Sequence, residues 1–132
     1  MAALGTILST ALIPTEAEAN LSGIVSFTGI ITPTALGANT NDYNPTGLST
    51  SNVIRLSSTN TFDLTGITAQ GSGITLILLN VGTNNIILKN NNAGSVAANR
   101  FQLTGDITLN GDDFIAIWYD TVSSRWRAIG KF

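Results

Sequence analysis

The sequence predicts an all-β fold, an antiparallel β-sandwich of the jelly-roll type that carries an extended N-terminal arm. Short segments rich in β-branched and aromatic residues recur about every ten residues, between turns rich in Gly and Asn. No stretch after residue 23 shows a convincing helical period. Charged residues make up 11% of the chain, against about 25% in ordinary soluble proteins. We expect an arm, residues 1–23, and a β-sandwich domain, residues 24–132, with a small trimeric β-prism as the alternative fold.

The arm is apolar and contains no Lys or Arg. If residues 2–12 form a helix, Leu4, Leu8 and Leu12 share one face of it, and Pro14 ends it. An apolar terminus needs a surface to hold it in place. Two interpretations stay open: the arm folds onto its own domain, or it attaches to a neighbouring subunit or a larger particle. In the second case the expected contact residues are Leu4, Ile7, Leu8, Leu12 and Ile13.

The predicted strands of the domain have β-branched or alternating patterns. They are residues 24–32, 53–56, 62–64, 74–79, 86–89, 101–103, 107–109, 113–119 and 125–129. The longest loop, residues 34–52, is dense in Gly, Asn, Thr and Ser. Tyr43 is the large aromatic residue of this loop. It either fixes the loop to the core or contacts a partner, since Tyr is enriched at interfaces.

The last two strands carry both tryptophans of the chain. Phe114, Ala116 and Trp118 fall on one face of their strand, and we expect Phe114 and Trp118 to hold the core. Whether Trp126 lies in the core or at the surface stays open. Its neighbours are two arginines that share one face of the last strand.

These two neighbours are Arg125 and Arg127. The sequence does not decide between several ion-pair partners for them. We expect them to pair with Asp113 or Asp120 across the hairpin, or with a neighbouring subunit.

Two segments resemble each other at a distance of about forty residues, which predicts two related halves. Residues 62–68 (FDLTGIT) match residues 101–108 (FQLTGDIT), with one residue inserted. The glycines and the following apolar positions continue the match.

Composition argues against several classes of function. The net charge is −2 and no basic residue precedes Arg55, so we expect no nucleic-acid partner. The chain has no His and no Cys, which removes the usual general base and thiol nucleophile, so we expect no enzyme and no cofactor. No apolar run reaches the roughly 20 residues of a membrane span. Asp106, Asp112 and Asp113 are interpreted as turn residues, with a Ca²⁺ site left open.

Several short motifs resemble a pattern found at the C-terminal end of bacteriophage virion proteins, including fibre, tail and head-decoration domains. The matching residues cover roughly the last half of the chain and are Asn99-Arg100-Phe101, Leu109-Asn110-Gly111, Trp118-Tyr119-Asp120 and Arg125-Trp126, with Leu78–Gly82 and Asn85–Leu88 upstream.

This resemblance implies a head-decoration (cement) protein on the capsid surface of the virion. Its partners would be further copies of itself, as a homotrimer, and the major capsid protein. The contact residues would be those of the arm together with Tyr43, Arg125 and Arg127. The alternative is a receptor- or glycan-binding domain of a tail fibre, which would use Tyr43, Trp126 and loop asparagines.

Overall fold

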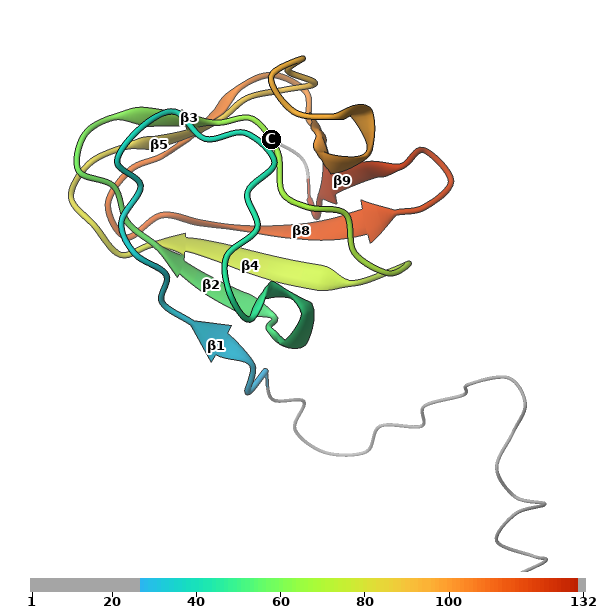
Figure 1. Cartoon of the computed structure of the whole chain (residues 1–132), viewed down its shortest axis with the longest axis horizontal. Helices are drawn as coiled ribbons and strands as arrows, with labels where there is room; N and C mark the ends of the chain where they lie inside the picture. The colour runs from blue at the N-terminus through green and yellow to red at the C-terminus, as the bar shows by residue number, and fades with distance from the viewer. Residues whose placement is uncertain (1–26, 131–132) are drawn as a thin grey trace, which may run out of the picture.

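The computed structural model describes residues 27–130, which form nine strands in two sheets (Figure 1). The six-stranded sheet has the order β1-β2-β4-β8-β9-β6, and the three-stranded sheet has the order β3-β5-β7. Two short 3₁₀ helices, η1 (Leu48–Thr50) and η2 (Ala97–Asn99), lie between strands. The strands are β1 (Ile30–Ile31), β2 (Val53–Leu56), β3 (Phe62–Leu64), β4 (Thr75–Asn80), β5 (Ile86–Leu88), β6 (Phe101–Gln102), β7 (Ile107–Leu109), β8 (Phe114–Asp120) and β9 (Arg125–Ala128).

The first part of the domain winds through parallel coils. Ile30 pairs with Val53, which pairs with Ile77, so equivalent positions recur at a nearly constant spacing along the sequence. On the second sheet Phe62 pairs with Ile86, at the same spacing as Val53 and Ile77. We call residues 30–52, 53–76 and 77–100 the first, second and third coils. The first and second coils each return the chain to the same sheet one strand further along, whereas the third leads to β6 at the far edge of that sheet.

The C-terminal part runs back antiparallel and closes this stack. Strand β8 pairs with β4, β7 pairs with β5, and β9 pairs with β8, all antiparallel. The pairs β1–β2, β2–β4, β3–β5 and β6–β9 are parallel. The prediction of an antiparallel, jelly-roll-like topology is therefore wrong in these four strand pairs, because alternation of polar and apolar residues looks the same in both kinds of sheet. The β-rich class itself is confirmed.

The predicted loop 34–52 turns out to be the body of the first coil. Leu36, Thr40 and Tyr43 each form a parallel bridge to the second coil. The Leu36 amide donates to the Ser57 carbonyl at 2.8 Å, and the Tyr43 amide donates to the Gly66 carbonyl at 2.9 Å. The sequence did not reveal these contacts, because single-residue bridges leave no periodic pattern.

One hydrophobic core draws residues from both sheets. Its fully buried members are mostly Ile and Leu, spaced two apart along their strands as the pleat requires. They include Ile54, Leu56, Leu64, Leu76, Leu78, Ile86, Leu88, Ile115 and Ile117, together with Phe101 and Trp126.

The forty-residue repeat does not produce two equivalent halves. Strands β3 and β5 both belong to the three-stranded sheet, whereas β6 and β9 both belong to the six-stranded sheet. What the two copies share is a parallel pair: Phe62 with Ile86, and Phe101 with Trp126. The structural period of the first part is the length of one coil, which is shorter than the sequence repeat.

None of the helical segments within residues 27–130 has the length and hydropathy of a membrane-crossing helix.

Candidate interaction surfaces

The outer face of the six-stranded sheet is apolar across four neighbouring strands. Directly paired residues point to the same side of a sheet, so the register aligns Ile30, Val53, Ile77 and Ala116 in one row. A second row aligns Arg55, Leu79 and Phe114. We define the outer face by its apolar members, Ile30, Val53, Ile77, Leu79, Phe114 and Ala116.

Two members of the outer face are largely exposed: Ile30 at 55% and Phe114 at 67%. Ile129, at 47%, extends the face, since its amide donates to the Ala116 carbonyl at 2.8 Å. Ile30, Ile77 and Leu79 were not predicted as contact residues from the sequence. The sequence signal for this apolar face was the almost continuous apolar run of residues 74–79. Only the strand register shows which residues of the adjacent strands align with that run.

Phe114 does not hold the core, contrary to the prediction, and Trp118 is partly exposed. The alternate residues Ile115, Ile117 and Tyr119 point inward instead. Both faces of this strand are apolar, so the sequence pattern alone did not fix which face turns inward.

Trp126 is the tryptophan of the core and is fully buried. Its indole N–H donates to the Ile67 carbonyl at 2.8 Å, which satisfies its polar atom in the interior. Its ring lies edge-on to Tyr119, with centroids 5.1 Å apart. The Tyr119 hydroxyl donates in turn to the Ala98 carbonyl at 2.9 Å. This aromatic pair ties β8 and β9 to the second and third coils.

Arg127 forms one of the predicted ion pairs, because its Nε donates to Asp120 Oδ2 at 2.7 Å. The Ser123 hydroxyl donates to the same oxygen at 2.6 Å. The Ser123 hydrogen bond, followed by that of Arg127, lowers the pKa of Asp120 to about 2. The pair is partly exposed, so its main effect is to fix the side chains of the last hairpin.

Arg125 forms no ion pair with Asp113 or Asp120 within residues 27–130, and its pairing with a neighbouring subunit stays a prediction. Its Nη1 donates to the Ser124 carbonyl at 2.8 Å, and its Nε is buried without a partner among the described residues. Asp113 accepts instead from the amide of Asn110 at 2.9 Å and from its side chain at 2.7 Å, within the turn before β8.

A hollow of about 330 Å³ lies beside Trp118. Its lining residues are Gln102, Leu103, Thr104, Ile107, Trp118, Arg127, Ala128 and Gly130. Trp118 and Arg127 are paired neighbours on β8 and β9, and both residues line the hollow. This combination of an aromatic surface with hydrogen-bond donors suits a polar ligand as well as a protein partner.

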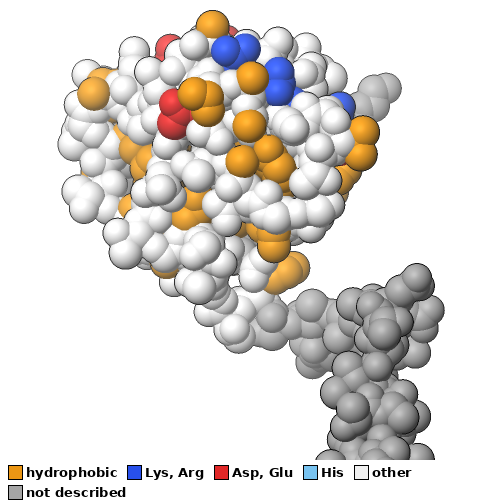
Figure 2. Space-filling model, turned by 45° about the vertical axis from the view of Figure 1, so that its right-hand side comes forward, with side chains coloured by type: hydrophobic (Ala, Val, Ile, Leu, Met, Phe, Trp, Pro, Cys, Tyr) orange, Lys and Arg blue, Asp and Glu red, His pale blue; other side chains and the backbone are white. Residues whose placement is uncertain are grey.

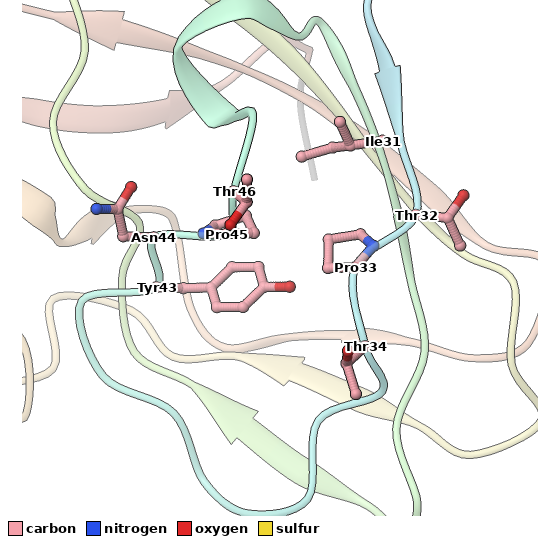
Figure 3. Close-up of a pocket in the computed structure, with 8 residues that line it drawn as sticks. All are labelled: Ile31, Thr32, Pro33, Thr34, Tyr43, Asn44, Pro45 and Thr46. Atoms are coloured by element: carbon pink, nitrogen blue, oxygen red, sulfur yellow. The ribbon is translucent and has the colours of Figure 1, made fainter.

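A larger hollow, of about 560 Å³, lies at the first coil and contains Tyr43. Figure 3 shows the Tyr43 ring pointing across it from residues 43–46 toward Pro33 on residues 31–34. Burial raises the pKa of the Tyr43 phenol. Tyr43 fixes its segment to the rest of the domain, because its backbone bonds to the second coil and its side chain packs against the core. Contact of Tyr43 with a partner stays a prediction.

Asp106 and Asp113 hold local structure. Asp106 pairs with Lys89 and accepts from the Asn90 amide at 2.8 Å, and these two bonds lower the pKa of Asp106. The bond to Asp106 also raises the pKa of Lys89. Asp112 lies in a turn with a φ of 67°. Within residues 27–130 no three acidic side chains come together as metal ligands, and the observed bonds fit the turn interpretation.

The five predicted contact residues of the arm lie outside the described residues. They are Leu4, Ile7, Leu8, Leu12 and Ile13.

Comparison with known proteins adds no functional assignment. No protein-family model and no curated protein matches the chain. A solved structure described as a chaperone–substrate complex is similar to it with a TM-score of 0.39 and 10% sequence identity. The match covers 73% of this chain and 16% of that chain.

Proposed function

We propose that the chain is a bacteriophage head-decoration protein that acts by binding and not by catalysis. In this proposal the two sheets form a sandwich that attaches to the outside of the capsid shell as a homotrimer. It bridges subunits of the major capsid protein and stabilises the shell. The observation that carries the proposal is the apolar outer face, with Phe114 at 67% exposure. The other members of this face are partly exposed, and apolar residues gathered on one accessible face are typical of interaction sites.

The low charge of the chain supports the same proposal. Charged residues make up 11% of the sequence, and in the view of Figure 2 they gather near the top while most of the surface is uncharged. A surface with so little charge does little to prevent self-association. Binding would depend on buried area, so salt would weaken it little. Each copy would add a modest contact, and many copies around a closed shell would act together.

A substitution on the outer face tests the proposal. Phe114→Ser should abolish self-association in sedimentation equilibrium while leaving the folding midpoint nearly unchanged, because the side chain is exposed. Val122→Ser is the matched control, since Val122 is 96% exposed but lies in the hairpin loop. An F114S chain that associates like the parent would contradict the role of this face.

The copy number of the chain in purified particles tests its location. Several hundred copies, lost together with the mechanical stability of heads, are expected for a decoration protein. A handful at the tail would contradict it and favour a fibre domain.

The alternative proposal is a receptor- or glycan-binding domain of a tail fibre, and the hollow beside Trp118 favours it. The expected role of Trp126 in stacking on a sugar is wrong, because its ring is fully buried. Trp118, with Gln102 and Arg127 at the same hollow, takes its place. Under this alternative, oligosaccharides should shift the Trp118 indole resonance in NMR titrations, and Arg127→Ala should weaken the shift. A Trp118 resonance unmoved across a broad panel of glycans would count against it.

A further inference from the structure

The first coil leaves one edge of the six-stranded sheet open. Strand β1 pairs with β2, and no other described strand lies on its far side. The Val53 amide donates to the Gly29 carbonyl at 3.0 Å. In a parallel ladder this register leaves the N–H and C=O of Ile30 pointing away from β2. An edge with free backbone groups of this kind can accept a further strand.

The core is open at the same end of the molecule. The hollow of about 560 Å³ is lined by residues of the first coil. Among them Ile31 packs against the core from a partly buried position. The position next to β1 would therefore place one side chain into this hollow and the next one on the outer face.

The sequence before residue 27 repeats the pattern of the first coil at the coil spacing. Ile7, Leu8 and Ile13 precede Ile30, Ile31 and Leu36, respectively, by one and the same offset. That offset is also the one by which Ile30 precedes its partner Val53 and Ile31 precedes its partner Ile54. Residues 7–9, Ile-Leu-Ser, also match residues 30–32, Ile-Ile-Thr, in chemical type.

We propose that residues 7–13 dock along the free edge of β1 of their own chain, as one further parallel coil. The Ile30 amide then donates to the Thr6 carbonyl, and the Leu8 amide donates to the Ile30 carbonyl. Leu8 enters the hollow next to Ile31, and Ile13 covers Leu36.

The connection favours the same chain over a second copy. The stretch between Ile13 and Ile30 is as long as the stretch between Leu36 and Val53, which the first coil joins within one chain. This inference does not depend on the proposed function. It assigns Leu8 and Ile13 to the core, whereas Ile7 lengthens the row of Ile30, Val53 and Ile77 on the outer face.

Cysteine cross-linking in the full-length chain tests the register, because the sequence contains no Cys. Neighbouring strands lie about 4.8 Å apart, within the Cα separation of roughly 4.4–6.8 Å that a disulfide spans. The double variant Ile7→Cys, Ile30→Cys should form an intramolecular disulfide under mild oxidation, seen by mass and by a faster-running band without reductant. Leu4→Cys with Ile30→Cys is the control that lies out of register and should stay mostly reduced.

Two results would overturn the proposal. Equal oxidation of both double variants would show collisions without a fixed register. Covalent dimers formed on mixing the single variants Ile7→Cys and Ile30→Cys would place the segment on a second copy. Neither result bears on capsid binding, so failure here is distinct from failure of the proposed function.

A pair of neighbouring substitutions provides a second readout. Leu8→Asp should lower the thermal midpoint by several degrees and reduce protection of the Ile30 amide from hydrogen exchange, because the new charge faces the hollow. Ile7→Asp, at the adjacent position but pointing outward, should leave both measurements nearly unchanged. Equal effects of the two substitutions would rule out the alternation on which the proposal depends.

Discussion

The two edges of the six-stranded sheet end in opposite ways. At the β6 edge, Phe101 pairs with Trp126 on one side and bridges Asn90 on the other, and both aromatic rings are fully buried. At the β1 edge, Ile30 is 55% exposed and the core ends in a hollow. Both edges are built from two-residue strands. The difference shows that closure comes from the antiparallel return of the chain and its aromatic residues, not from the strands themselves.

Removing the aromatic closure should have the largest effect on stability. Trp126→Ala should lower the free energy of unfolding by about 3–5 kcal/mol, as expected for a large side chain deleted from a core, and it also leaves the Ile67 carbonyl without its donor. Denaturant unfolding measures the change. Trp118→Ala is the matched control and should cost clearly less, because that ring is partly exposed. Equal losses would contradict the assignment of Trp126 as the core tryptophan.

Truncation of isoleucine side chains at equivalent positions of two coils separates the closed part of the core from its open end. Ile54 is fully buried in the second coil, and its partner Ile31 lies at the open end. Ile54→Ala should lower the free energy of unfolding by about 2–5 kcal/mol. Ile31→Ala should cost less in the chain that begins at residue 27, where the hollow is open. In the full-length chain Ile31→Ala should lower the free energy of unfolding by more, if residues 7–13 cover Ile31. Equal losses in both chains would argue against such cover.

The smallest effect concerns the last hairpin. The folded pKa of Asp120, about 2, lies below its ordinary value of 3.8. The carboxylate therefore contributes stability above pH 3.8, and this contribution is lost as the pH falls from 3.8 toward 2. Carboxyl chemical shifts give the midpoint. Ser123→Ala should raise the Asp120 pKa more than Arg127→Ala does, because the serine hydrogen bond is the larger cause. The reverse order would show that the ion pair dominates.

The strands were largely predictable from the sequence. Residues 53–56, 62–64 and 107–109 were predicted with the observed bounds, and residues 74–79 and 113–119 are each displaced by a single position. Alternating and apolar runs between Gly- and Asn-rich turns carry enough local information for this. The ion pair of Arg127 with Asp120 was also among the predicted pairs.

The strand directions and the inward face of β8 were not predictable in the same way. Both depend on contacts between residues far apart in sequence, such as Ile30 with Val53 and Ile77 with Ala116. The core position of Trp126 depends on the carbonyl of Ile67, which comes much earlier in the chain. The outer face is therefore a property of the register, and no single strand displays it.

The position of β8 in the sheet determines when the sheet can be completed during synthesis of the chain. Strand β4 holds the sheet centre between β2 and β8, and Ile77 meets Ala116 only after β5, β6 and β7 have been made. Until then β4 is an apolar edge on the nascent chain. Pairings between distant segments form slowly, and unpaired edges are prone to aggregate. The pairing of β4 with β8 can therefore form only once β8 has emerged from the ribosome, and we expect a chain that ends before β8 to be prone to aggregate.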